Sequence, residues 1–163
     1  MIFREVPSMV FRSLIAVAAL ALAGCMTSAK PIATSGDKQL TAFMTAYTVA
    51  WNKHDAPTIA RDFYRMGRSV EEQTTATRKG FDDLVAQGYD KSDIHEIKAC
   101  VTGPDTGWAG MHFSRLKTDG TPLPPKDRAS SYDLKKFPDG WRIVKLNGGD
   151  PAKPLECPGR AAG

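Results

Sequence analysis

The hydrophobic spacing of this chain changes once, near residue 94, and that change restricts the fold class more than any other feature. Before it, apolar residues recur three and four positions apart, which is the spacing of helices with one buried face. After it, four short runs rich in β-branched and aromatic residues are separated by clusters of Gly, Pro and Asp, as in strands joined by turns. Helices followed by an antiparallel meander predict an α+β fold in which the helices cover one face of a curved sheet.

The boundaries of these elements follow from local signals. A first helix is expected over residues 40–51, and Asp55 can cap a second helix because Pro57 is tolerated in a first helical turn. A third helix contains Phe81 and stops at Gly88. Strands are expected at 94–101, 108–116, 129–137 and 141–146. The Pro-Asp-Gly turn at 138–140 is short enough for a hairpin. These elements make one domain, over residues 37–147.

Residues 1–24 have the organisation of a cleaved export signal. Arg4 and Arg12 precede an uncharged run that ends in small residues. As a helix, a run of roughly eleven residues would cover about 16 Å, whereas the hydrocarbon core of a bilayer is about 30 Å thick. A permanent membrane span is therefore not expected from this segment.

The residues at 22–25, Leu-Ala-Gly-Cys, resemble the lipobox of bacterial lipoproteins. The resemblance implies that Cys25 is diacylated and becomes the new N-terminus, so that acyl chains attach the protein to a membrane. Because Met26 rather than Asp follows, it also implies an outer-membrane location facing the periplasm. An ordinary secretory signal and an uncleaved hydrophobic N-terminus are the alternatives, and Met9 is an alternative start.

Residues 25–36 are small and polar, which is typical of a flexible tether. With Cys25 acylated, Cys100 and Cys157 remain in a compartment where disulfides persist. A bond between them would close a loop of about 57 residues, contribute roughly 4 kcal/mol in the chain-entropy treatment, and hold the tail at 148–163. The alternative is a buried Cys100 with a free thiol at Cys157.

Composition excludes several classes of function. The formal net charge is +4, 25% of residues are charged, and the sequence has no basic run, so a nucleic-acid partner is not expected. His54, His95 and His112 lack the spacing of metal ligands, so no metal is expected. The sequence has no glycine-rich phosphate loop, and no cofactor is expected.

Three segments together resemble the nuclear transport factor 2-like (NTF2-like, or SnoaL-like) superfamily. They are the end of the first helix at 47–55, the helix containing Gly80-x-x-x-Leu84, and the closing hairpin at 132–143. The resemblance covers residues 37–146 and implies a cone, made by a strongly bent antiparallel sheet around helices, with a pocket inside. It also implies a homodimer formed through the outer sheet face. Members include isomerases, dehydratases, cyclases and binding domains, so the fold does not fix the function.

The ketosteroid isomerase branch provides the enzyme hypothesis. Its motif places Tyr47 as an oxyanion donor, Asp133 as a protonated donor and Glu71 at the position of the base. This chain departs from the motif because the base would be Glu instead of Asp, and because Lys135 could keep Asp133 ionised. Each residue also has a structural interpretation: Tyr47 as a core side chain, Asp133 as a solvated carboxylate and Glu71 as part of a surface acidic pair.

Four further residues are candidates for a pocket lining: Trp51, Trp108, His112 and Phe113. Three hypotheses follow, in order of preference. The first is a lipid-anchored binding or accessory module for a small apolar molecule or an envelope protein partner. The second is an isomerase or dehydratase that moves a proton beside a carbonyl. The third is a structural envelope protein whose cone is filled.

Overall fold

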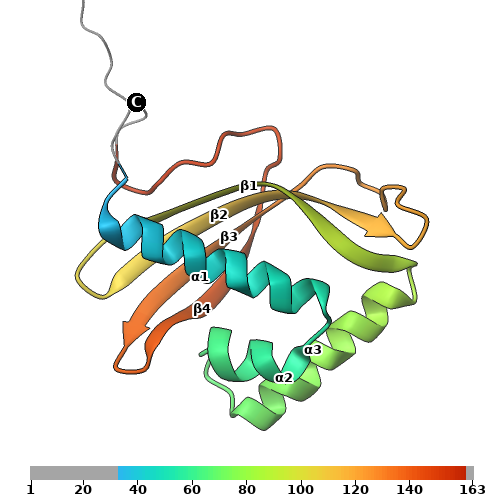
Figure 1. Cartoon of the computed structure of the whole chain (residues 1–163), viewed down its shortest axis with the longest axis horizontal. Helices are drawn as coiled ribbons and strands as arrows, with labels where there is room; N and C mark the ends of the chain where they lie inside the picture. Colours follow the sequence, from blue (N-terminus) through green and yellow to red (C-terminus); the bar gives the residue numbers. More distant parts are fainter. Residues whose placement is uncertain (1–32, 161–163) are drawn as a thin grey trace, which may run out of the picture.

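Four antiparallel strands form one curved sheet, and the helices pack on its inner face (Figure 1). The computed structural model describes residues 33–160, so the expected signal, Cys25 and most of the expected tether lie outside the described residues. The strands pair in chain order: β1 (Tyr89–Val101), β2 (Thr106–Lys117), β3 (Arg128–Phe137) and β4 (Gly140–Gly149). The expected α+β fold class, with a curved sheet around N-terminal helices, is confirmed.

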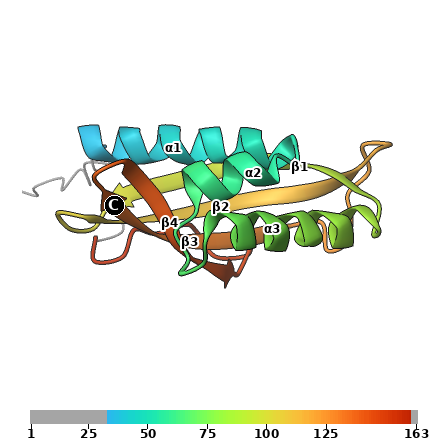
Figure 2. The ribbon, with the colours of Figure 1, turned by 90° about the horizontal axis from the view of Figure 1, so that it is seen from below.

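The helices form the second layer. Helix α1 (Ser35–Asn52) crosses the inner face of the sheet, and the short α2 (Ala56–Thr58) continues directly into a π-helical turn, η1 (Ile59–Phe63). Helix α3 (Val70–Val85) packs on α2 and η1. Figure 2 shows α1 on one side of the strands and α3 at the lower edge of the cone. The second expected helix is therefore mostly a π-turn.

Capping explains where the helices begin. Asp55 accepts a hydrogen bond from the backbone N–H of Thr58 at 3.1 Å, as expected. Helix α1 begins after Thr34, which forms a capping box with Asp37. Ser69 and Glu72 form the same motif at the start of α3. These caps satisfy backbone donors that the first helical turn leaves without partners.

Strand β1 is longer than the expected segment at 94–101. It begins at Tyr89, and its pairing with β2 shifts register twice, between Tyr89 and Lys91 and between Ile94 and Glu96. Each shift inserts one residue into β1 and breaks the two-residue alternation by which a strand is recognised in a sequence. The stretch 89–93 therefore gives no strand signal in the sequence although it pairs with β2.

The core lies between α1 and the concave face of the sheet. Leu40 and Met44 of α1 are fully buried, as are Ile59 of η1, Leu134 of β3 and Ile143 of β4. Burying each such side chain contributes about 1.5–3 kcal/mol. Within the described part of the chain, no helix is both long and apolar enough to cross a membrane.

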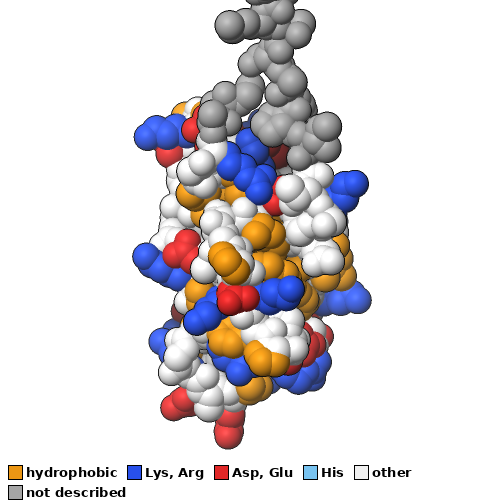
Figure 3. Space-filling model, turned by 90° about the vertical axis from the view of Figure 1, so that its left-hand side faces the viewer, with side chains coloured by type: hydrophobic (Ala, Val, Ile, Leu, Met, Phe, Trp, Pro, Cys, Tyr) orange, Lys and Arg blue, Asp and Glu red, His pale blue; other side chains and the backbone are white. Residues whose placement is uncertain are grey.

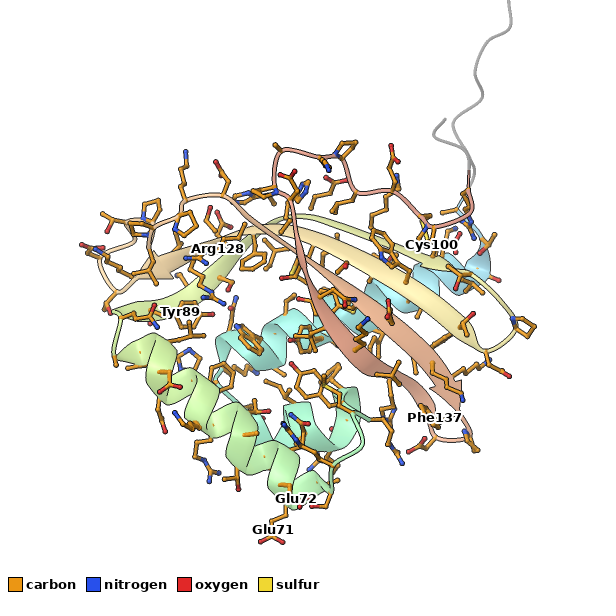
Figure 4. The ribbon with its side chains drawn as sticks, turned by 180° about the vertical axis from the view of Figure 1, so that it is seen from behind. Glu71, Glu72, Tyr89, Cys100, Arg128 and Phe137 are labelled. Carbon is orange, nitrogen blue, oxygen red and sulfur yellow. A yellow bond between two sulfur atoms is a disulfide. The ribbon has the colours of Figure 1, made fainter. Side chains whose placement is uncertain are left out.

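The C-terminal tail is part of the fold. A disulfide joins Cys157 to Cys100 on the outer face of β1, and Figure 4 shows Cys100 beside the returning tail. A Cβ at Gly110 would lie 2.9 Å from the Leu155 side chain, so the glycine allows the tail to approach β2 closely. The tail thus covers part of the outer sheet face through which a homodimer was expected.

The surface at one end of the molecule is mixed in character. On the face in Figure 3, Lys and Arg side chains are interspersed with acidic and hydrophobic ones. This face therefore has no continuous basic surface.

Candidate functional site

A partly open cavity of about 80 Å³ lies inside the cone, between α1 and the concave face of the sheet. At about 30 Å³ each, it would hold about two or three water molecules. Helix α1 and all four strands contribute to its wall. The lining residues are Tyr47, Thr48, Trp51, Ser92, Ile94, Met111, Phe113, Arg115, Ser130, Tyr132 and Leu146.

Strand geometry explains why these residues share one surface. Successive side chains of a strand point to opposite faces, so Met111, Phe113 and Arg115 of β2 point inward together. Ser130 lies opposite Met111 in the register of β2 and β3, and points to the same face. Tyr47 on α1 faces them across the cavity.

A buried cluster of tyrosines forms the polar floor of the cavity. The hydroxyls of Tyr47 and Tyr64 are hydrogen-bonded at 2.8 Å, and the ring centroids of Tyr47 and Tyr132 are 5.7 Å apart. Burial raises the pKa of Tyr47 well above its ordinary value and raises the pKa of Tyr132 to about 12. These phenols stay neutral at physiological pH, so they can donate hydrogen bonds but cannot act as bases.

A second hydrogen-bond chain fixes the wall on the other side. The indole N–H of Trp51 donates to the Tyr89 hydroxyl at 3.0 Å, and that hydroxyl is 3.0 Å from the hydroxyl of Ser92. The amide of Asn52 bonds both the N–H and the C=O of Ser92, each at 2.9 Å. The end of α1 is thereby tied to the irregular part of β1, which holds Trp51 in place.

Arg115 is the charged residue of the lining, and it is half-buried. Its guanidinium carbon is 6.0 Å from the centroid of the Tyr89 ring. Burial, together with the nearby positive charge of Arg128, lowers the pKa of Arg115. The lining contains no Asp, Glu or His among residues 33–160.

The three predicted catalytic residues do not meet. Tyr47 lines the cavity, but Glu71 is exposed in the first turn of α3 and points to solvent (Figure 4). Asp133 lies on β3 between the buried, inward-pointing Tyr132 and Leu134, so its side chain is on the outer face. The expected constellation of Tyr47, Glu71 and Asp133 is therefore not assembled.

Two of the four candidates for a pocket lining do line the cavity, and the other two lie on the outer face of the sheet. Trp51 and Phe113 line the cavity. Trp108 and His112 lie on the outer face of β2, so placing them in the pocket was wrong. Trp108 packs where a Cβ of Gly110 would lie, and the Nδ1 of His112 is 3.5 Å from the carboxylate of Glu96.

Sequence reasoning missed Arg115, Ser130 and Tyr64. Arg115 follows Phe113 by two positions, so the alternation that placed Phe113 in the pocket also placed Arg115 there. Tyr64 gives no such signal, because it follows η1 and meets the sheet only through an isolated bridge to Ile143. The part of the chain that the structure describes has no cluster of three or more His, Cys, Asp or Glu side chains that could hold a metal ion.

The bent sheet, the helices inside it and the cavity between them define a cone-shaped α+β domain. Residues 37–151 match the family described as NTF2-like protein (DUF6841), and the chain belongs to that family. The expected superfamily is therefore confirmed. None of the curated proteins matches this chain.

Solved structures with NTF2-like or cystatin-like folds resemble this domain. An NTF2-like protein from Novosphingobium aromaticivorans is 18% identical, with a TM-score of 0.51, and the match covers 68% of this chain and 79% of that one. A domain of unknown function from Nostoc punctiforme is 17% identical, with a TM-score of 0.53 and coverages of 69% and 76%. An NTF2-like protein of unknown function from Shewanella oneidensis is 16% identical, with a TM-score of 0.50 and coverages of 69% and 98%. These likenesses show the fold alone.

Proposed function

We propose that this protein is a lipid-anchored lipoprotein of the cell envelope, facing the periplasm from the outer membrane, whose cone cavity binds a small organic molecule. The observation that best supports this proposal is the composition of the cavity wall. Trp51, Ile94, Met111, Phe113 and Leu146 supply an apolar surface, while a few hydroxyls and one guanidinium supply polar groups. Apolar walls with a few placed polar groups are typical of sites for small molecules.

The same wall supports binding over proton transfer. Moving a proton beside a carbonyl needs a group that accepts it near neutral pH. Among residues 33–160, the lining offers neutral phenols, hydroxyls and a guanidinium, and none of these is such a base.

Filling the cavity should weaken binding. We expect Ser130→Leu to weaken the binding of butanol and butyrate about fivefold or more, because overpacking a tight site costs about 1–3 kcal/mol and each 1.4 kcal/mol is about a factor of ten. Isothermal titration calorimetry on the purified full-length protein in detergent would measure the affinities. These four-carbon probes match the apolar wall without requiring any catalytic group.

Ser131→Leu is the matched control. Ser131 is the next residue of β3 and points to the outer face, so this variant adds the same side chain outside the cavity. It should bind the probes as the wild type does. If no probe binds the wild type, or if both variants bind equally well, the cavity is not a binding site.

The lipid anchor has its own test. Cys25 lies outside the described residues, and its acylation rests on the sequence at 22–25. We expect Cys25→Ala to abolish palmitate labelling and to move the protein from the membrane fraction to the soluble fraction, because several acyl chains are needed for stable attachment. A Cys25→Ala variant that stayed in the membrane fraction would rule out this anchor.

A further inference from the structure

Two arginines lie close together on the inner face of the sheet, and one of them, Arg115, lines the cavity. Arg115 follows Phe113 by two positions on β2, and Arg128 lies directly opposite Phe113 in the register of β2 and β3. Both side chains therefore leave the sheet on its inner face. Figure 4 shows Arg128 and Tyr89 at the same end of the sheet, and the Tyr89 ring lies 6.0 Å from the Arg115 guanidinium carbon.

Neither arginine has an acidic partner. Four other arginines, Arg61, Arg65, Arg142 and Arg160, each lie within 3.0 Å of an aspartate. Within the described chain, by contrast, no carboxylate lies within 4.0 Å of either Arg115 or Arg128. The pair is therefore an uncompensated positive charge at the cavity.

Their hydrogen-bonding capacity is also largely unused. Arg128 donates from Nη2 to the carbonyl oxygen of Pro124 at 2.7 Å. The Nε of Arg115 and the Nε of Arg128 are buried and have no hydrogen-bond partner within residues 33–160. Buried donors without partners cost about 1–3 kcal/mol each, and two like charges held together add repulsion. An anion between the guanidinium groups would remove both costs.

Resting on the proposed function, we infer that the natural ligand is a small organic acid, whose carboxylate is held by Arg115 and Arg128 while its short apolar body enters the cavity. A guanidinium group matches a carboxylate in shape, because its planar N–H donors pair with both oxygens. Trp51, Met111 and Phe113 form the surface for the apolar body. A cavity of about 80 Å³ limits that body to a few carbon atoms.

The test compares butyrate, butyramide and propylphosphonate on the full-length protein by isothermal titration calorimetry. The three probes share a propyl chain and differ in the head group. We expect butyrate to bind at least about tenfold more tightly than butyramide, because a hydrogen bond to a charged group is worth about 1.5–3 kcal/mol and 1.4 kcal/mol is a factor of ten. Propylphosphonate should bind more weakly than butyrate.

Arginine variants test whether Arg115 and Arg128 are the residues that bind the carboxylate. Arg115→Gln and Arg128→Gln should each weaken butyrate binding about tenfold and leave butyramide binding unchanged, because only the carboxylate uses the charge. Arg78→Gln is the matched control, since Arg78 is exposed on α3 and forms no ion pair within the described residues. It should bind all three probes as the wild type does.

A stability measurement separates a ligand-binding role from a structural one. If the two arginines are held against mutual repulsion, Arg115→Gln should keep or raise the melting temperature of the ligand-free protein while it lowers the stabilisation by butyrate. A large loss of ligand-free stability would assign a structural role to Arg115 and overturn the inference.

Three further outcomes would contradict either this inference or the proposed function, and they can be told apart. Equal affinities for butyrate and butyramide would overturn the carboxylate inference and leave the binding function intact. Tighter binding of propylphosphonate than of butyrate would assign the site to phosphate-type anions and also overturn it. Failure of all three probes to bind would count against the proposed function itself.

Discussion

Removing the disulfide should lower the free energy of unfolding by about 4 kcal/mol, because the chain-entropy treatment assigns this value to a closed loop of such length. The bond joins Cys100 and Cys157, which are 57 residues apart in the sequence. Without it, the tail that covers Gly110 would be held mainly by Leu155 and Arg160. Urea unfolding followed by tryptophan fluorescence would measure the difference between wild type and Cys157→Ser.

Replacing Cys157 tests the disulfide more cleanly than replacing Cys100 would. Cys157 is only partly buried, whereas Cys100 is fully buried, and a serine at residue 100 would add the cost of a buried hydroxyl. Wild-type protein in a reducing agent is the control and should unfold at the same urea concentration as Cys157→Ser. Identical midpoints for wild type with and without the reducing agent would contradict the prediction.

Asp37→Asn should destabilise the protein by about 3 kcal/mol, because removing one partner of a buried ion pair costs about 3–5 kcal/mol and Arg160 is partly exposed. The Asp37 carboxylate is almost fully buried at the start of α1. It accepts hydrogen bonds from Arg160 Nη1 at 2.9 Å, from the N–H of Val101 at 2.8 Å and from the N–H of Thr34 at 2.9 Å. An Asn side chain at this position would place its own N–H donors against the groups that donate to the Asp37 carboxylate.

The effect of Asp37 should depend on pH. The guanidinium of Arg160, and then the backbone donors, hold the pKa of Asp37 well below its ordinary value. A lowered folded-state pKa contributes stability that is fully present above the unfolded-state value of about 4 and is lost as pH falls below it. Urea unfolding at several pH values should therefore show the gap between wild type and Asp37→Asn narrowing below about pH 4.

Glu71→Gln is the control for this titration. Glu71 is exposed and forms no ion pair within residues 33–160, so its replacement should leave both the stability and its pH dependence unchanged. A gap between wild type and Asp37→Asn that stayed constant through acid would show that the Asp37 carboxylate is not stabilised by its charge.

Much of the fold follows from local sequence. The spacing along α1, the Asp55 cap and the turn at 138–140 each depend on neighbouring residues, which is why they predict the structure correctly. The start of β1 does not follow from local sequence, because its two register shifts are set by pairing with β2, more than ten residues away.

The site was only partly predictable. Tyr47, Trp51 and Phe113 were correctly expected at the cavity, since each lies on a strongly apolar face. Trp108 was placed on the wrong face because the C-terminal tail covers the outer side of β2. Large apolar side chains therefore lie on both faces of β2, Trp108 outside and Phe113 inside, so an apolar side chain alone does not indicate which face is inside.

The sequence by itself determined the order of the helices and strands and the α+β fold class, because periodicity and caps are properties of the chain, whereas it left the bond between Cys100 and Cys157 as one of two alternatives. Only the tertiary structure decided that Arg115 and Arg128 converge while Asp133 faces away. The physical reason is that sheet faces are set by the register of β2 with β3 and by the tail that covers the outer side.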